Sequence, residues 1–410
     1  MERRNIKSMN VLFLTLIEIN SIEERGIYQD LLRKFRDEGH SVTVVCPAER
    51  RRKINTNLRY SDGVSILQVK TLNIQKVNVL EKGLGMIALE YQFLYGINKY
   101  LSDKKFDLVL YSTPPITLAK VVQYVKNRDK ALTYLLLKDI FPQNAVDIGM
   151  MREGSLLYKM FRKKEKTLYV VSDAIGCMSS ANQAYVLKHN PEIQEDKVEV
   201  NPNTIAPISF EYSDTEKENI RRKYGIPLDK KIFVYGGNLG KPQGIDFLLE
   251  AILCTSREDV FYLIVGDGTE YDRINDWFKE HKPVNAKLIQ QLPKNDFDKL
   301  LASCDVGLIF LDKRFTIPNF PSRLLSYLEM KMPVLAATDS STDIGDIIED
   351  AGCGFKVMAG NHKEMQDKIE KLLEMDMEVL GENAYQLLLN EYTVDRSYEI
   401  INKFVRANSL

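Results

Sequence analysis

The sequence predicts an α/β protein made of two doubly wound domains, and three observations lead to this expectation. The chain has 410 residues, which is more than a single hydrophobic core usually serves. Short apolar runs alternate with helical patterns, as is typical of parallel sheets covered by helices. This series begins again at the strand-like run 232–237, IFVYGG, after a charged stretch. We therefore expect two domains, each with its own core.

The first βαβ unit lies near the start of the chain. Residues 10–16 read NVLFLTL, a strand pattern, and a helix is expected over 26–40 because Ile27, Leu31 and Phe35 recur at helical spacing. A second strand follows at 42–46. Three further apolar runs complete the expected sheet of the first domain, at 107–112, 132–137 and 174–178.

The second series of strands defines the second domain. After 232–237, the apolar runs that we expect to form strands lie at 263–266, 287–290, 306–311, 333–337 and 354–358. We place the N-terminal domain at 1–204 and the C-terminal domain at 205–390. The final segment, 391–410, is expected to be a helix that returns to the N-terminal domain.

Composition excludes several classes of function. A net charge of −1 argues against a general nucleic-acid-binding surface. The five cysteines are odd in number and lack C-x-x-C spacing, which favours a reducing, cytoplasmic location. The four histidines are scattered, so no metal site is predicted. Asp296 and Asp298 form a D-x-D pattern, but the preceding Pro-Lys-Asn favours the first turn of a helix.

A glycine-rich loop follows the first strand of the second domain. The segment 236–251 reads GGNLGKPQGIDFLLEA and runs from a strand into an amphipathic helix. Such a loop allows backbone N–H groups and a helix N-terminus to approach a phosphate. The alternative is an ordinary tight turn, because the pattern is neither G-x-G-x-x-G nor a Walker loop.

A second candidate anion site lies at 318–336, PNFPSRLLSYLEMKMPVLA. Ser322 and Arg323 stand where a helix is expected to begin, so a hydroxyl and a guanidinium would lie beside backbone donors, a combination suited to a diphosphate. The alternative is that Ser322 is a plain N-cap and Arg323 a solvated residue of the first turn.

Together these blocks resemble glycosyltransferase family 4, especially its members in bacterial surface-polysaccharide assembly. Four blocks match in order over nearly the whole chain: Gly26 with EGHSVTVV, KDIFPQNAVDIG at 138–149, YGGNLGKPQGIDFLLEA, and PSRLLSYLEMKMPVLA. The resemblance implies the GT-B fold, in which two Rossmann-like domains face each other across a cleft. It places the nucleotide on the C-terminal domain and the acceptor on the N-terminal domain.

The resemblance also implies an activity. It implies a retaining transferase that moves a hexose or N-acetylhexosamine from a nucleoside-diphosphate sugar, with UDP as the expected nucleotide. The acceptor would be a lipid-linked or other glycan of the cell surface, such as a capsule or O-antigen precursor. No metal or other cofactor is required. The alternatives are a sugar-nucleotide epimerase with the same fold and a non-catalytic sugar-nucleotide-binding subunit.

Site residues are carried over position by position from this resemblance. The expected catalytic residues are Asp139, Arg323 and Lys241, although a structural role for Asp139 is an equal alternative. The expected donor-binding residues are Gly26, Gly237, Asn238, Gln243, Gly266, Leu292, Asn319, Phe320, Ser322, Ser326 and Glu329. Ser326 occupies the position at which the family usually has a ribose-binding glutamate. Glu329, on the same helix face, is the expected substitute.

A basic amphipathic segment suggests a membrane partner. Residues 152–167 carry six Lys or Arg and two Glu, with apolar residues at helical spacing. The alternative is a core-facing helix with a solvated basic side. The apolar segment 84–101 is a second candidate for contact with a lipid acceptor. We expect a peripheral protein on the inner face of the cell membrane.

Overall fold

The chain forms two α/β units in the computed structural model, which describes residues 8–74 and 79–408. The N-terminal unit comprises Met1–Ala206 together with Val394–Leu410, and the C-terminal unit comprises Pro207–Thr393. The sequence placed these divisions at 204/205 and 390/391. Among the described residues, no helix is both long and apolar enough to cross a membrane.

An eight-stranded sheet forms the centre of the N-terminal unit. All its neighbouring strands are parallel except β3 and β4, which form an antiparallel pair. In spatial order the strands are β3 (Asn57–Ser61), β4 (Val64–Thr71), β2 (Ser41–Glu49), β1 (Asn10–Leu14), β5 (Leu108–Ser112), β6 (Leu132–Leu137), β7 (Ala174–Cys177) and β8 (Val198–Val200). The order reverses between β1 and β5, which makes the sheet doubly wound.

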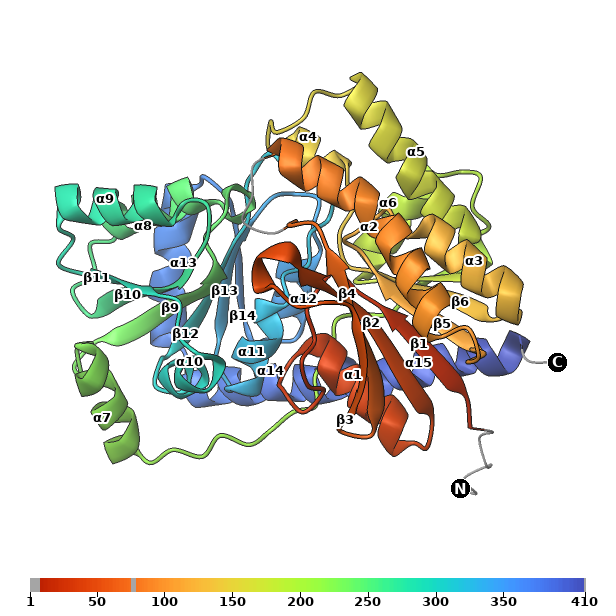
Figure 1. Ribbon diagram of the computed structural model, residues 1–410. Coiled ribbons are helices and arrows are strands. Elements are labelled where there is room, and N and C mark those ends of the chain that lie inside the picture. Colours follow the sequence, from red (N-terminus) through yellow and green to blue (C-terminus); the bar gives the residue numbers. More distant parts are fainter. Residues whose placement is uncertain (1–7, 75–78, 409–410) are drawn as a thin grey trace. The chain divides into compact units, whose positions relative to one another are not determined.

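Helices cover both faces of this sheet. They are α1 (Ile27–Asp37), α2 (Val79–Tyr100), α3 (Ala119–Asp129), α4 (Gln143–Asp147), α5 (Leu156–Val171), α6 (Ser180–His189) and α15 (Val394–Asn408). Figure 1 shows α2, α3 and α5 grouped together, whereas α1 packs against α15. The last helix of the chain is therefore part of this core, and its Tyr398 ring meets Phe35 edge-on at 5.0 Å.

The C-terminal unit contains a six-stranded sheet in which every pair of neighbours is parallel. Its order is β11 (Ala286–Gln290), β10 (Val260–Asp267), β9 (Lys231–Asn238), β12 (Val306–Phe310), β13 (Val334–Thr338) and β14 (Gly354–Met358). These are the six strands expected from the apolar runs. The order reverses between β9 and β12, and ligands of open α/β sheets bind outside the carboxyl ends of strands at such a point.

The helices of the C-terminal unit connect these strands and extend beyond them. They are α7 (Asp214–Tyr224), α8 (Ile245–Cys254), α9 (Tyr271–His281), α10 (Lys294–Leu301), α11 (Arg323–Glu329), α12 (Ile344–Asp350), α13 (His362–Glu374) and α14 (Met377–Glu391). One continuous cluster of buried residues joins β9, β10 and β12 to α8 and α13. In the D-x-D pattern on α10, Asp296 lies in the first turn of the helix, as expected, and buried Asp298 pairs with Lys294 one turn earlier.

The segment that connects the two units is anchored at both ends. In the N-terminal unit the buried Asp30 accepts a hydrogen bond from the Ala206 N–H at 2.8 Å. In the C-terminal unit the buried Glu329 accepts one from the Ile208 N–H at 2.9 Å.

Candidate active site

The predicted donor residues of the C-terminal unit fall mainly at one edge of its sheet. Gly237 and Asn238 end β9, Gly266 lies next to the end of β10, and Leu292 lies in the loop after β11. Arg323 begins α11, beyond the loop that follows β12. Because all six strands are parallel, these positions share the carboxyl edge, and the β9 and β12 loops flank the point at which the strand order reverses.

Arg323 has the most informative environment at this edge. Its guanidinium lies over the Tyr235 ring, 4.2 Å from the centroid, and its Nη2 donates a hydrogen bond to Gln243 Oε1. Its Nη1 is buried and has no hydrogen-bond partner among the described residues. A buried donor without a partner is costly, and a charged one more so, which indicates a place for an acceptor from outside the protein.

No carboxylate of the described chain forms an ion pair with Arg323, so its charge is not neutralised. Lys241, in the short turn between β9 and α8, is exposed and likewise has no ion pair in the part of the chain that the structure describes. Two uncompensated cations therefore flank the carboxyl end of β9. This arrangement suits an anion.

Two glycines shape the same edge. Gly237 has φ of +120°, a conformation that side chains rarely adopt, and it brings the backbone close to the Arg323 guanidinium. A Cβ on Gly266 would lie 1.9 Å from the Gly237 carbonyl oxygen, so only glycine permits this approach of β10 to β9. The backbone geometry therefore requires glycine at both positions, in addition to their expected place beside the donor.

The three predicted residues of the loop before α11 have different environments. The Asn319 Nδ2 is buried and, within the described residues, has no partner, while the Asn319 carbonyl accepts from Thr342 Oγ1 at 2.5 Å. The Ser322 side chain is exposed and makes no capping hydrogen bond, so it is not the plain N-cap of the alternative interpretation. Phe320 was expected to bind the donor, but its ring is buried and packs on the Tyr392 ring at a centroid distance of 6.0 Å, which makes the side chain part of the core.

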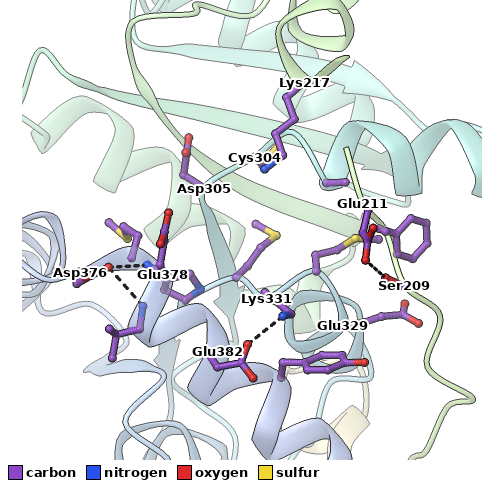
Figure 2. Close-up of a pocket in the computed structure, with 18 of the residues that line it drawn as sticks. Ser209, Glu211, Lys217, Cys304, Asp305, Glu329, Lys331, Asp376, Glu378 and Glu382 are labelled. Atoms are coloured by element: carbon purple, nitrogen blue, oxygen red, sulfur yellow. Dashed lines mark hydrogen bonds and ion pairs between the residues drawn. The ribbon is translucent and has the colours of Figure 1, made fainter. Parts of the chain in front are cut away.

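Glu329 also differs from expectation. Helix α11 has seven residues and is therefore about 10 Å long, so its last residue lies at the opposite edge of the sheet from Arg323. There Glu329 lines a pocket of about 810 Å³ together with Asp305 and Pro333, which precede β12 and β13 (Figure 2). Its carboxylate accepts from the Ile208 N–H. The structure thus assigns Glu329 to the linker rather than to a ribose, and half-buried Ser326 stays nearer the donor edge.

The N-terminal unit has its own predicted residues at the carboxyl edge of its sheet. Asp139 follows β6, and both of its carboxylate oxygens lie near Asn144 Nδ2, at 2.7 and 2.8 Å. Its N–H donates to Thr113 Oγ1 at 3.1 Å. Gly26 precedes α1 in an extended conformation open to any residue, and a Cβ there would meet only the movable Gln29 side chain. The local backbone therefore does not require glycine at 26.

The sequence analysis missed two residues, Lys138 beside Asp139 in the N-terminal unit and Tyr235 beneath Arg323 in the C-terminal unit. Burial lowers the pKa of Lys138 to about 7, and its Nζ donates to the Asn201 carbonyl at 3.2 Å. Tyr235, in the middle of a run that read only as a strand, supplies the surface on which Arg323 rests. The only available signal was an aromatic residue with a polar hydroxyl directly before the glycine pair Gly236-Gly237. Among the described residues, no group of three or more His, Cys, Asp or Glu could hold a metal ion.

Comparison with known proteins gives a family match for the C-terminal unit. Residues 216–387, which lie in the C-terminal unit, match the family model described as glycosyl transferases group 1. The chain is 25% identical to WbjE of Pseudomonas aeruginosa, named a probable glycosyltransferase, over 80% of both chains. It is 24% identical to TuaC of Bacillus subtilis (strain 168), named for teichuronic acid biosynthesis, over 55% of this chain and 52% of that one.

A solved structure shares the complete fold. Anabaena Alr3699/HepE, in complex with UDP and glucose, has a TM-score of 0.70 at 16% identity, and the match covers 97% of this chain and 100% of that one. The GT-B fold predicted from the sequence is therefore confirmed.

Proposed function

We propose that this chain, which has the GT-B fold and matches the model of glycosyl transferases group 1 over residues 216–387, transfers a hexose or N-acetylhexosamine, with retention, from a UDP-sugar to a lipid-linked or other glycan acceptor. The products would be cell-surface polysaccharides, such as a capsule or O-antigen. A relative named for teichuronic acid biosynthesis supports the pathway, and the fold shared with a protein in complex with UDP and glucose supports the donor.

One observation carries this proposal: the buried and unpartnered Nη1 of Arg323, on a guanidinium that no carboxylate neutralises. A nucleoside diphosphate is an acceptor of the right charge, and its oxygens match the geometry of an arginine fork. The donor amide of Asn319, also without a partner in the described chain, adds a second donor on the same loop.

The chemistry assigned to these residues is the stabilisation of a leaving group. During transfer, the bond between the anomeric carbon and the diphosphate oxygen breaks, and its electron pair stays on that oxygen. The acceptor oxygen bonds to the anomeric carbon, and its proton passes to the departing diphosphate oxygen. Arg323 and Lys241 stabilise the negative charge that develops on the diphosphate, the electrostatic effect that is usually the largest single contribution to catalysis.

The remaining site residues complete the proposal. Asn238, Gln243 and Ser322 would contact the phosphates or shape their loop, and Gly266, Leu292 and Ser326 would border the base and ribose. In the N-terminal unit, Gly26 and Asp139 stay predictions for contact with the donor.

We also propose that the N-terminal unit binds an anionic membrane surface through α5. At its start, Leu156 is 87% exposed and Leu157 47% exposed, with Lys159 and Lys163 nearby and without ion pairs in the described chain. Apolar side chains beside free cations favour such a surface. The location would then be peripheral, on the inner face of the cell membrane.

The structure sharpens which α5 charges could serve this contact. Arg162 pairs with buried Glu165, and Lys164 pairs with buried Glu90 at 3.1 Å. These two cations are engaged within the fold, and only part of the basic segment is free for lipid. The opposite side of α5 packs into the unit through Phe161 and Leu168. One side of the helix thus faces the core, as in the second interpretation of its sequence, and the exposed side is the part that supports the proposed membrane contact.

A thermal-shift screen tests the donor. UDP, GDP, CDP and dTDP, and then their sugars, are added to the protein, and the nucleotide that binds the folded state raises its midpoint. We expect UDP to give the largest shift and Arg323→Ala to abolish most of it. The control is Arg222→Ala, an exposed arginine on α7 paired with Glu218. Binding without sugar transfer to any membrane-extracted acceptor would instead indicate a non-catalytic subunit.

Vesicle co-sedimentation tests the membrane contact. The double variant Lys159→Gln/Lys163→Gln should bind vesicles of phosphatidylglycerol more weakly by about 1 kcal/mol per charge at low salt. Lys299→Gln/Lys363→Gln removes two exposed lysines of the C-terminal unit and is the matched control. Equal partitioning of both double variants and the unaltered protein would remove α5 as a docking surface.

A further inference from the structure

Tyr235, a residue of β9, has a side chain that is fully buried beneath Arg323. The Arg323 guanidinium carbon lies 4.2 Å from the centre of the Tyr235 ring. At this distance the electron-rich face of the ring attracts the cation. Burial raises the pKa of Tyr235, partly offset by the nearby positive charge of Arg323, so the phenol stays neutral at physiological pH.

The hydroxyl of Tyr235 extends the same contact to the loop after β9. It donates to the Asn238 carbonyl at 3.0 Å and lies 3.2 Å from Gln243 Oε1, so its single proton is shared between two acceptors. Gln243 Oε1 also accepts from Arg323 Nη2. Tyr235 thereby fixes both the plane of the guanidinium and the amide that holds one of its nitrogens.

Every group that holds Arg323 is uncharged. An aromatic face and an amide oxygen fix its position without cancelling its charge, whereas a carboxylate in either place would form an ion pair and compete with an incoming anion. The Arg323 guanidinium is held through Nη2, whereas Nη1 is buried without a partner in the described chain. A side chain that is preorganised to bind an anion requires such uncharged neighbours.

We propose that Tyr235 is a positioning residue that, with Gln243, holds Arg323 ready for the second phosphate of a nucleoside diphosphate. This inference rests on the proposed function. It adds that selection of a diphosphate over a monophosphate depends on a tyrosine that does not itself touch the ligand.

Calorimetric titration with UDP and UMP separates positioning from general structural damage. The measured quantity is the ratio of the two affinities, because only UDP presents the second phosphate. Tyr235→Leu removes ring and hydroxyl and should lower the UDP preference about 3- to 30-fold, the range of one partly buried cation–π contact. Tyr235→Phe keeps the ring and should lower it about 2- to 10-fold. UMP affinity should change less than twofold in both.

Two further variants control the measurement. Gln243→Glu keeps the hydrogen bond but neutralises Arg323, and it should bring the UDP affinity close to that for UMP. Tyr262→Phe alters another buried tyrosine, on β10, whose hydroxyl bonds Thr255 at 2.8 Å, and it should leave the ratio unchanged. In an Arg323→Gln background, Tyr235→Phe should have no further effect on the ratio, since the two residues act as one unit.

The outcomes are distinct. If Tyr235→Phe and Gln243→Glu both retain the full UDP preference, or if UDP and UMP affinities fall in parallel as in a destabilised fold, the positioning role is overturned. If the unaltered protein itself binds UDP no better than UMP, the proposed diphosphate site fails, and the inference fails with it. Tyr235→Leu need not fold for this decision, because the other two variants make it.

Discussion

The carboxyl edges of the two sheets use their polar groups in opposite ways. In the N-terminal unit, Asp139 has both oxygens near the Asn144 amide and its N–H bonded to Thr113. In the C-terminal unit, Arg323 keeps a buried nitrogen without a partner in the described chain and a charge without a counterion. A group that the fold has already satisfied contributes first to stability, whereas an unsatisfied one gains most when a ligand arrives.

The strongest test of this comparison is Arg323→Ala. It removes the unneutralised cation, and we expect transfer to fall roughly 100- to 1,000-fold, the scale for losing one donor that stabilises transition-state charge. The measurement is kcat/KM with the sugar nucleotide that the thermal screen identifies. Arg222→Ala should retain full activity. A folded Arg323→Ala protein with near-normal turnover would contradict the assignment.

Ser326→Glu probes how far along α11 the donor reaches. A carboxylate could accept from both ribose hydroxyls, and each charge-assisted hydrogen bond is worth about 1.5–3 kcal/mol, so nucleotide binding should tighten. Calorimetry with UDP measures this. The matched control is Glu329→Gln, at the far end of the same helix, which should leave affinity unchanged. Unchanged affinity for Ser326→Glu would show that this helix does not hold the ribose.

Asp139→Ala tests the carboxyl edge of the N-terminal sheet, where the polar groups of Asp139 already have partners. If its main role is to hold the turn after β6, the loss of its hydrogen bonds should lower the free energy of unfolding by about 1–3 kcal/mol and activity by less than tenfold. Asn144→Ala should reproduce the loss of stability. Denaturant unfolding and steady-state kinetics on both variants decide the matter. A fall in kcat of more than 100-fold at normal stability would instead make Asp139 catalytic.

The smallest effect on transfer is expected from Lys138→Met. This variant instead tests how the stability of the fold depends on pH. The pKa of Lys138 is lowered from 10.5 to about 7, so burial disfavours its charged form. As pH falls from 10.5 to 7, the unfolded chain gains a proton that the fold resists, and stability is lost until it levels off below pH 7. Lys138→Met should therefore stabilise the protein more at pH 6 than at pH 9. Equal gains in melting temperature at both values would contradict this.

Local pattern predicted most of the fold because strands and helices depend on spacing along the chain. The six strands of the C-terminal unit and the helix that begins at Ile27 follow directly from apolar periodicity. The antiparallel pair β3 and β4 was missed although Asp62-Gly63 is a hairpin turn signal. Strand β8 has only three residues, too few for periodicity to detect.

The sequence by itself determined the two α/β units, the glycine loop and the presence of cations beside it. It could not decide which charges are free, because that depends on partners far away along the chain. Gln243 and Arg323 are 80 residues apart, and the linker that engages Glu329 lies 121 residues before it. On α5, four of the cations read alike in the sequence, but Arg162 and Lys164 pair with buried acids while Lys159 and Lys163 do not. Only the tertiary structure brings such groups together, since a charge is neutralised by what lies within a few ångströms of it and not by its neighbours in sequence.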